Sequence, residues 1–134
     1  SEQVESLNYA EILAPEKKDI LLKLHEAKWG EISKISTNFE MLKIQGDFNS
    51  LDFNELRFDV VYYDAFSPDK QPELWSLDLF KKIYDACNPN AILTTYCAKG
   101  VVRRMLQTAG FKVERLPGPP GGKREILRAT KSNL

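Results

Sequence analysis

Residues 58 to 75 of this 134-residue chain read FDVVYYDAFSPDKQPELW, and they decide the fold. The first six, Phe58 to Tyr63, form a mainly apolar run of the kind that makes a buried parallel strand. Asp64 follows directly, and open α/β sheets bind their ligands just outside the carboxyl ends of such strands. Pro68 and Pro72 then restrict the backbone of the segment. We therefore expect a stiff binding loop at this edge of a parallel sheet.

Outward from this stretch, predicted strands alternate with predicted helices. We expect strands at 39–45, 58–63, 91–96, 111–116 and 125–129, and helices at 3–12, 16–28, 73–86 and 99–109. Residues 49–56 are predicted to form a short helix or turn, and residues 88–90 a turn. This alternation predicts an α/β fold with a parallel sheet. The last two strands have no helix between them, so we expect an antiparallel pair at one edge, all within a single domain.

The composition is that of an ordinary globular protein, with 43% hydrophobic and 28% charged residues. No apolar stretch approaches the ~20 residues that span a bilayer. The first residues are polar and acidic, unlike a signal peptide. Cys87 and Cys97 have neither metal-ligand nor disulfide-framework spacing. We expect a reduced, cytoplasmic protein without a membrane partner.

The charge is unevenly distributed along the chain. Residues 1–95 carry 10 Lys and Arg against 17 Asp and Glu, whereas residues 96–134 carry 9 against 2. A basic carboxyl-terminal third is either a solvated face or a patch that contacts nucleic-acid phosphates. The pairs Arg103-Arg104 and Lys123-Arg124 are the candidates for such contacts.

Three segments are candidates for chemistry. Asp64 with Phe66 suits an amino group, which a carboxylate and an aromatic face both stabilise when it is cationic. The alternative is that Asp64 only caps a turn or the next helix. Asp47, after Gly46, is placed either to accept hydrogen bonds from an adenine or ribose or to form a turn. Tyr96 and Lys99 follow the next strand and either line the same cleft or form a simple strand-to-helix connection.

These residues resemble a known family. The run from Asp64 to Trp75 is similar to the Asp-Gly/Ala-Phe-x-Pro-x-Lys-x-Pro-x-x-Trp motif of MnmC-type tRNA methyltransferases. The stretch from Val102 to Phe111 is also similar, as are Gly118 and the Lys123-Arg-Glu125 segment. The matches keep their order across roughly residues 47–129.

The resemblance implies a class I, Rossmann-like methyltransferase fold that uses S-adenosylmethionine. The family methylates the 5-aminomethyl group of a modified wobble uridine in tRNA, and in many bacteria the domain is fused to a flavin (FAD)-dependent oxidoreductase. Asp64 and Phe66 would be catalytic, and Asp47 with Asp64 would bind the cofactor. The residues implied to face the substrate tRNA are Pro68, Lys70, Tyr96, Lys99, Arg103, Arg104, Lys123 and Arg124.

One departure from the family pattern is large. The family opens with two strands and a glycine-rich turn, and none of the seven glycines here makes a Gly-x-Gly after a strand. We expect residues 1–134 to be the carboxyl-terminal two thirds of a truncated methyltransferase domain that is inactive alone. Its exposed sheet edge is expected to pair in a homodimer, to exchange an element, or to be covered by strand 39–45. Alternative interpretations are an aminopropyltransferase-like enzyme and a non-catalytic RNA-binding module.

Overall fold

The computed structural model describes residues 18–122 and 125–133, in two compact units, Ser1–Asp47 and Phe48–Leu134. In the first unit, helix α3 (Lys18–Glu26) is followed by strands β1 (Ile32–Ser36) and β2 (Phe39–Leu42), which form an antiparallel hairpin. Gly30 N–H donates to the Lys43 carbonyl at 2.6 Å beside this hairpin. The helix predicted at 3–12 lies outside the described residues.

The hairpin corrects one expectation. Residues 39–45 were expected to join the parallel sheet, but β2 pairs antiparallel with β1, a strand that we did not predict. The two strands are joined by a turn at Thr37-Asn38. Such a short connection lets neighbouring segments pair locally, without the crossover that a parallel strand needs.

The second unit is built on one mixed sheet with the order β3-β4-β6-β5. Its strands are β3 (Phe58–Tyr62), β4 (Cys87–Thr95), β5 (Lys112–Pro117) and β6 (Glu125–Thr130). β3 and β4 are parallel, whereas β6 runs antiparallel to both β4 and β5. The expected antiparallel pair of last strands is confirmed, and β6 lies inside the sheet between β4 and β5. The amino end of β6 consequently meets the carboxyl ends of β3 and β4.

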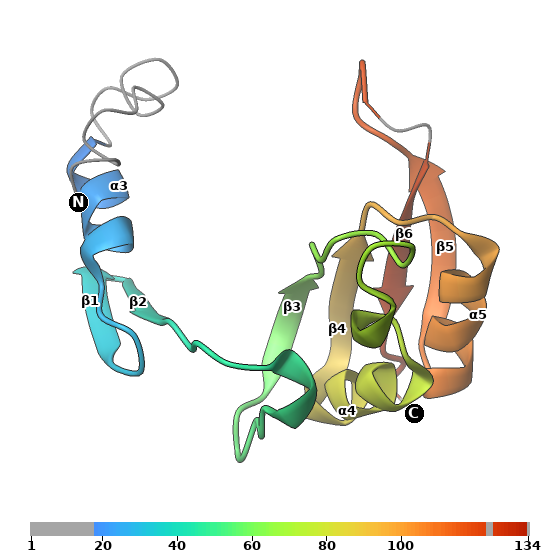
Figure 1. The fold of residues 1–134 in the computed structure, drawn as a ribbon, viewed down its shortest axis with the longest axis horizontal. Helices are drawn as coiled ribbons and strands as arrows, with labels where there is room; N and C mark the ends of the chain where they lie inside the picture. The colour runs from blue at the N-terminus through green and yellow to red at the C-terminus, as the bar shows by residue number, and fades with distance from the viewer. Residues whose placement is uncertain (1–17, 123–124, 134) are drawn as a thin grey trace. The chain divides into compact units, whose positions relative to one another are not determined.

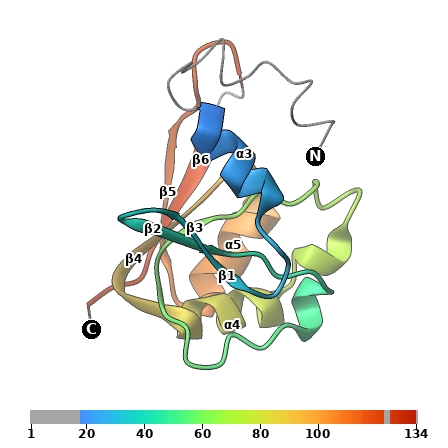
Figure 2. The same ribbon diagram turned by 90° about the vertical axis from the view of Figure 1, so that its left-hand side faces the viewer.

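Two helices pack on one face of this sheet, α4 (Leu77–Ala86) and α5 (Gly100–Ala109), as Figures 1 and 2 show. The core between helices and sheet consists of buried, mainly apolar side chains. Its largest fully buried side chains are Phe80, Ile83, Leu93, Val102, Leu106 and Leu127. Burial of this kind contributes roughly 1.5–3 kcal/mol per large apolar side chain. The helices and strands that contribute these side chains are those that the apolar pattern of the sequence predicted.

Two element boundaries differ from prediction. The helix expected at 73–86 is divided into a 3-10 turn, η3 (Pro72–Leu74), and α4, because the Ser76 hydroxyl accepts a hydrogen bond from Leu79 N–H and caps α4 there. The turn expected at 88–90 is wrong. Those residues belong to the irregular start of β4, where the pairing with β3 shifts register and Asn90 N–H donates to the Lys131 carbonyl.

The segment at 49–56 begins with a 3-10 turn, η2 (Phe48–Ser50). Helix α5 ends at Ala109, as predicted. Gly110 follows it with a φ of +125°, which is accessible to glycine, and the Tyr84 ring packs against Gly110. In the described residues β3 pairs only with β4, and Val60 and Tyr62 are 52% and 83% exposed. Pairing of two copies through this edge stays a prediction.

Candidate functional site

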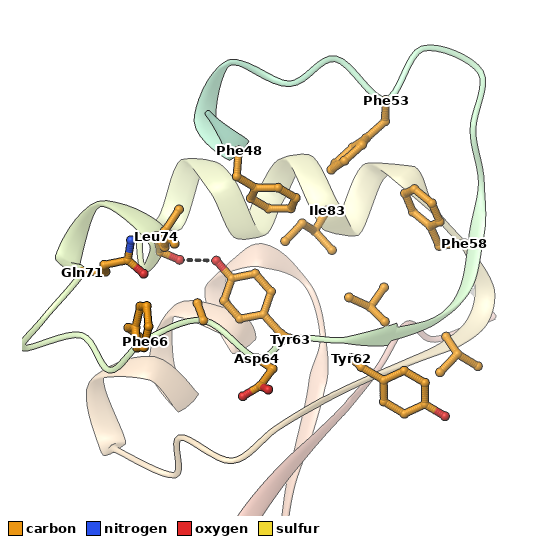
Figure 3. A pocket seen from close by; sticks show the side chains of 13 residues that line it. Phe48, Phe53, Phe58, Tyr62, Tyr63, Asp64, Phe66, Gln71, Leu74 and Ile83 are labelled. Atoms are coloured by element: carbon orange, nitrogen blue, oxygen red, sulfur yellow. Dashed lines mark hydrogen bonds between the residues drawn. The ribbon is translucent and has the colours of Figure 1, made fainter. Parts of the chain in front are cut away.

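The loop after β3 is closed by hydrogen bonds between its beginning and its end. The indole N–H of Trp75, a side chain only 5% exposed, donates to the Phe66 carbonyl at 2.7 Å. The Tyr63 hydroxyl donates to the Leu74 carbonyl (Figure 3). Burial raises the pKa of Tyr63 to about 12, so this hydroxyl keeps its proton at neutral pH. These bonds fix the backbone on both sides of Asp64 and Phe66.

Further contacts order the middle of the loop. The backbone N–H groups of Lys70 and Gln71 both donate to the Ser67 carbonyl, at 2.9 and 2.8 Å. The Asp69 carboxylate accepts a hydrogen bond from the Lys99 ammonium at 2.8 Å, which ties the loop to the turn before α5. This hydrogen bond raises the pKa of Lys99. Both side chains are exposed, so the pair positions the loop more than it stabilises the fold.

A cavity of about 830 Å³ opens beside the loop and is called the aromatic cavity here. Its aromatic wall residues are Phe48, Phe53, Phe58, Tyr62, Tyr63 and Phe66 (Figure 3). Asp64 and Gln71 add the polar side chains. A mainly apolar cavity with few polar groups is typical of small-molecule sites, and aromatic walls suit a flat ring.

A second cavity, of about 580 Å³, is lined by residues from three strand ends and is called the polar cavity. Asp64 follows β3, Thr95 and Tyr96 close β4, Lys99 precedes α5, and Glu125 opens β6. Tyr63, Asp64 and Ala65 line both cavities. Asp64 therefore lies where a molecule in one cavity and a molecule in the other can approach each other.

The structure brings together part of the predicted site. Asp64 lines both cavities, Phe66 lines the aromatic cavity with 69% of its surface exposed, and Tyr96 and Lys99 line the polar cavity. The expectation that the strand ends at Asp64 and at Tyr96 border one cleft agrees with this arrangement. The roles of these residues stay predictions.

The other predicted residues lie elsewhere. Pro68 and Lys70 belong to the loop, and Arg103 and Arg104 to α5; none of the four is among the lining residues of the two cavities. Asp47 belongs to the first unit, so its contact with a cofactor stays a prediction. Lys123 and Arg124 lie outside the described residues.

Several residues that line the cavities received no role from the sequence, among them three that can contribute to binding. Phe48 and Gln71 line the aromatic cavity, and Glu125 lines the polar cavity. Glu125 is distant from Asp64 in sequence, and only the antiparallel placement of β6 brings its end to the same edge of the sheet. Phe48 directly follows Asp47, a predicted cofactor-binding residue, and this position in the sequence is a signal that could have identified it.

Two kinds of feature are absent from residues 18–122 and 125–133. No group of three or more His, Cys, Asp or Glu side chains there is arranged to hold a metal ion. No helix in that part of the chain has both the length and the apolar character needed to cross a membrane.

Comparisons with known proteins give a consistent result. Residues 8–132 match the model of a family described as S-adenosyl-L-methionine-dependent methyltransferase. The chain is similar to the tRNA 5-methylaminomethyl-2-thiouridine biosynthesis bifunctional protein MnmC of Pseudomonas savastanoi pv. phaseolicola, with 42% identity over 74 residues, which are 55% of this chain and 11% of that protein. The MnmC of Nitrosospira multiformis is 44% identical over 70 residues, which are 52% of this chain and 11% of that protein.

A solved structure is also similar. The crystal structure of MNMC2 from Aquifex aeolicus superposes with a TM-score of 0.59 at 33% sequence identity, and the match covers 69% of this chain and 32% of that one. The matched segments thus span a small part of the curated relatives and about a third of the solved chain.

Proposed function

Because the chain belongs to the S-adenosyl-L-methionine-dependent methyltransferase family, we propose that it is part of an enzyme that methylates the 5-aminomethyl group of a modified wobble uridine in tRNA. The names of the relatives support this substrate, since they refer to 5-methylaminomethyl-2-thiouridine biosynthesis in tRNA. The position of Asp64 between two cavities supports the reaction type, because a transfer enzyme must hold a donor and an acceptor next to each other.

The described residues fit part of S-adenosylmethionine. The aromatic cavity offers flat apolar walls for an adenine ring, and Asp64 with the exposed Phe66 offers a carboxylate and a π face for a cationic centre. When bound, the cofactor supplies an activated methyl group on a sulfonium. Phe48, Asp64 and Phe66 are the residues that we expect to hold it.

The polar cavity takes the acceptor amine in this proposal. Asp64 accepts a hydrogen bond from the amine N–H, which orients the nitrogen lone pair, and its negative charge stabilises the ammonium product. Tyr96, which is 53% exposed beside this cavity, offers a ring on which a base can stack. The closed loop holds Asp64 in place, so little reorganisation is needed during transfer.

The macromolecular partner and the compartment follow from the same proposal. The basic carboxyl-terminal third, including Arg103 and Arg104, contacts tRNA phosphates. The enzyme works in the cytoplasm, where tRNA is modified, and a flavin-dependent oxidoreductase acts with it as a fused or separate partner, consistent with the word bifunctional in the relatives' names.

The test is an Asp64→Asn substitution in the complete protein, assayed for methyl transfer from labelled S-adenosylmethionine to tRNA that carries the 5-aminomethyl group. We expect kcat to fall by at least about 100-fold, the range typical when a preorganised polar group is lost. Asp85→Asn, at an exposed position of α4, is the matched control and should keep normal activity. A near-normal kcat in the Asp64 variant contradicts the assignment.

A further inference from the structure

The polar cavity has an uncompensated negative charge among its described lining residues. Asp64 and Glu125 are acidic, and Lys99 is the basic residue among them. The Lys99 ammonium lies 2.8 Å from the carboxylate of Asp69, which does not line the cavity. Among the described lining residues, Lys99 is thus paired with Asp69 and not with the two cavity carboxylates, which suit a cationic or N–H-rich ligand.

The strand order explains how the two carboxylates reach one cavity. Asp64 follows the carboxyl end of β3, and Glu125 is the first residue of β6. β4 lies between these strands, and β6 runs antiparallel to it, with Thr95 opposite Leu127. The beginning of β6 is therefore at the same sheet edge as the ends of β3 and β4. Glu125 lines the cavity from a different strand than Asp64 and adds a second carboxylate to it.

We propose that Glu125 is a specificity-determining residue that binds the acceptor amine together with Asp64. This inference rests on the proposed function. A neutral primary amine has two N–H bonds and one lone pair. With one N–H donated to Asp64 and the other to Glu125, the lone pair is directed at the methyl group. The nitrogen lone pair forms the new N–C bond, the C–S bonding pair returns to sulfur, and the resulting secondary ammonium loses its proton to solvent.

Two carboxylate acceptors also favour the substrate over the product. The neutral secondary amine formed by one transfer has a single N–H, so it leaves one of the two carboxylates without its hydrogen bond. Sites built to pair with a polar group discriminate strongly against ligands that lack it. Glu125 thereby favours binding of the unmethylated amine and opposes a second methyl transfer.

The experiment compares Glu125→Gln with Glu125→Asp in the complete protein. The matched control is Glu55→Gln, an exposed residue outside both cavities. Steady-state kinetics use tRNA with the 5-aminomethyl group, and binding is measured with the same tRNA and with tRNA lacking that group. For Glu125→Gln we expect KM to rise about tenfold, because the neutral amide oxygen accepts a weaker hydrogen bond than the carboxylate does. Glu125→Asp should recover part of that loss, and the control should match the unsubstituted protein.

The outcomes separate this inference from the proposed function. No methyl transfer by the unsubstituted protein overturns the proposed function. Transfer by the unsubstituted protein with an unchanged KM in Glu125→Gln overturns only the role of Glu125. An equal loss of affinity for tRNA with and without the aminomethyl group also overturns it, because Glu125 would then contact the tRNA elsewhere. Mass spectrometry of the product nucleoside tests whether Glu125 opposes a second methyl transfer. We expect dimethylated amine only in the product of Glu125→Gln.

Discussion

Replacing Trp75 with phenylalanine tests whether the loop after β3 is held by a hydrogen bond across its ends. Trp75 is 5% exposed, and its indole N–H donates to the Phe66 carbonyl at 2.7 Å. Its ring also makes edge-on contacts with Tyr63 and Phe80, at centroid distances of 5.1 and 6.1 Å. Phenylalanine keeps an aromatic ring at this position but has no N–H. The substitution therefore removes the hydrogen bond and part of the packing, and little else.

Loss of the donor leaves the partly buried Phe66 carbonyl without this partner, which costs about 1–2 kcal/mol. The smaller ring gives up buried apolar surface worth about 1 kcal/mol. We expect the free energy of unfolding to fall by about 2–3 kcal/mol in total.

Urea denaturation followed by far-ultraviolet circular dichroism measures this change. Trp29→Phe is the matched control, because Trp29 is 60% exposed and its ring centroid lies 5.7 Å from the Lys43 ammonium. The control substitution should change the free energy of unfolding by less than about 0.5 kcal/mol. Equal effects of the two substitutions, or a change below about 0.5 kcal/mol for Trp75→Phe, would refute the reasoning.

Three other perturbations have clear expected outcomes. Gly110→Ala should destabilise the fold by about 1–3 kcal/mol, because Gly110 has a φ of +125° and an added Cβ would lie 2.7 Å from the Tyr84 ring. An unchanged thermal midpoint of unfolding would contradict this expectation. Because burial raises the pKa of Tyr63 to about 12 from 10.0, its contribution to stability is complete below about pH 10 and is lost as the pH rises toward 12. Tyr63→Phe should remove this part of the alkaline loss in urea titrations, and an identical pH profile would disprove it. Lys131→Met should lower the free energy of unfolding by about 1–3 kcal/mol in the same titrations. The reason is that the Lys131 ammonium donates at 2.9 Å to the carbonyls of Tyr84 and Cys87 at the end of α4. An unchanged free energy of unfolding would show that solvent replaces both bonds.

The loop from Asp64 to Trp75 shows how far local sequence carries a functional prediction. Its apolar strand, its carboxylate and its two prolines lie next to each other in the chain, so their order already placed Asp64 at a strand end. What holds the loop could not be foreseen in the same way. The acceptors for Trp75 and Tyr63 are the backbone carbonyls of Phe66 and Leu74, and a backbone carbonyl carries no residue-specific signal.

The predicted strand at 39–45 shows where local sequence is insufficient. An apolar segment of this length is compatible with a parallel or an antiparallel partner, and periodicity does not select between them. The strand pairs with β1 because β1 directly precedes it in the chain and a short turn joins the two. The division of the predicted helix at Ser76 was missed for a related reason, since a serine before an apolar run is a cap only if its hydroxyl faces a free N–H.

The sequence by itself determined the α/β class, the antiparallel final pair of strands and the place of Asp64 at a strand end, because these depend on apolar periodicity and on residues adjacent in the chain. The tertiary structure alone decided that Asp64 lines two cavities and that Glu125 shares one of them. The physical reason is the strand order. β6 inserts between β4 and β5 and runs antiparallel to both, which brings a carboxylate sixty-one positions away in sequence to the edge where Asp64 lies.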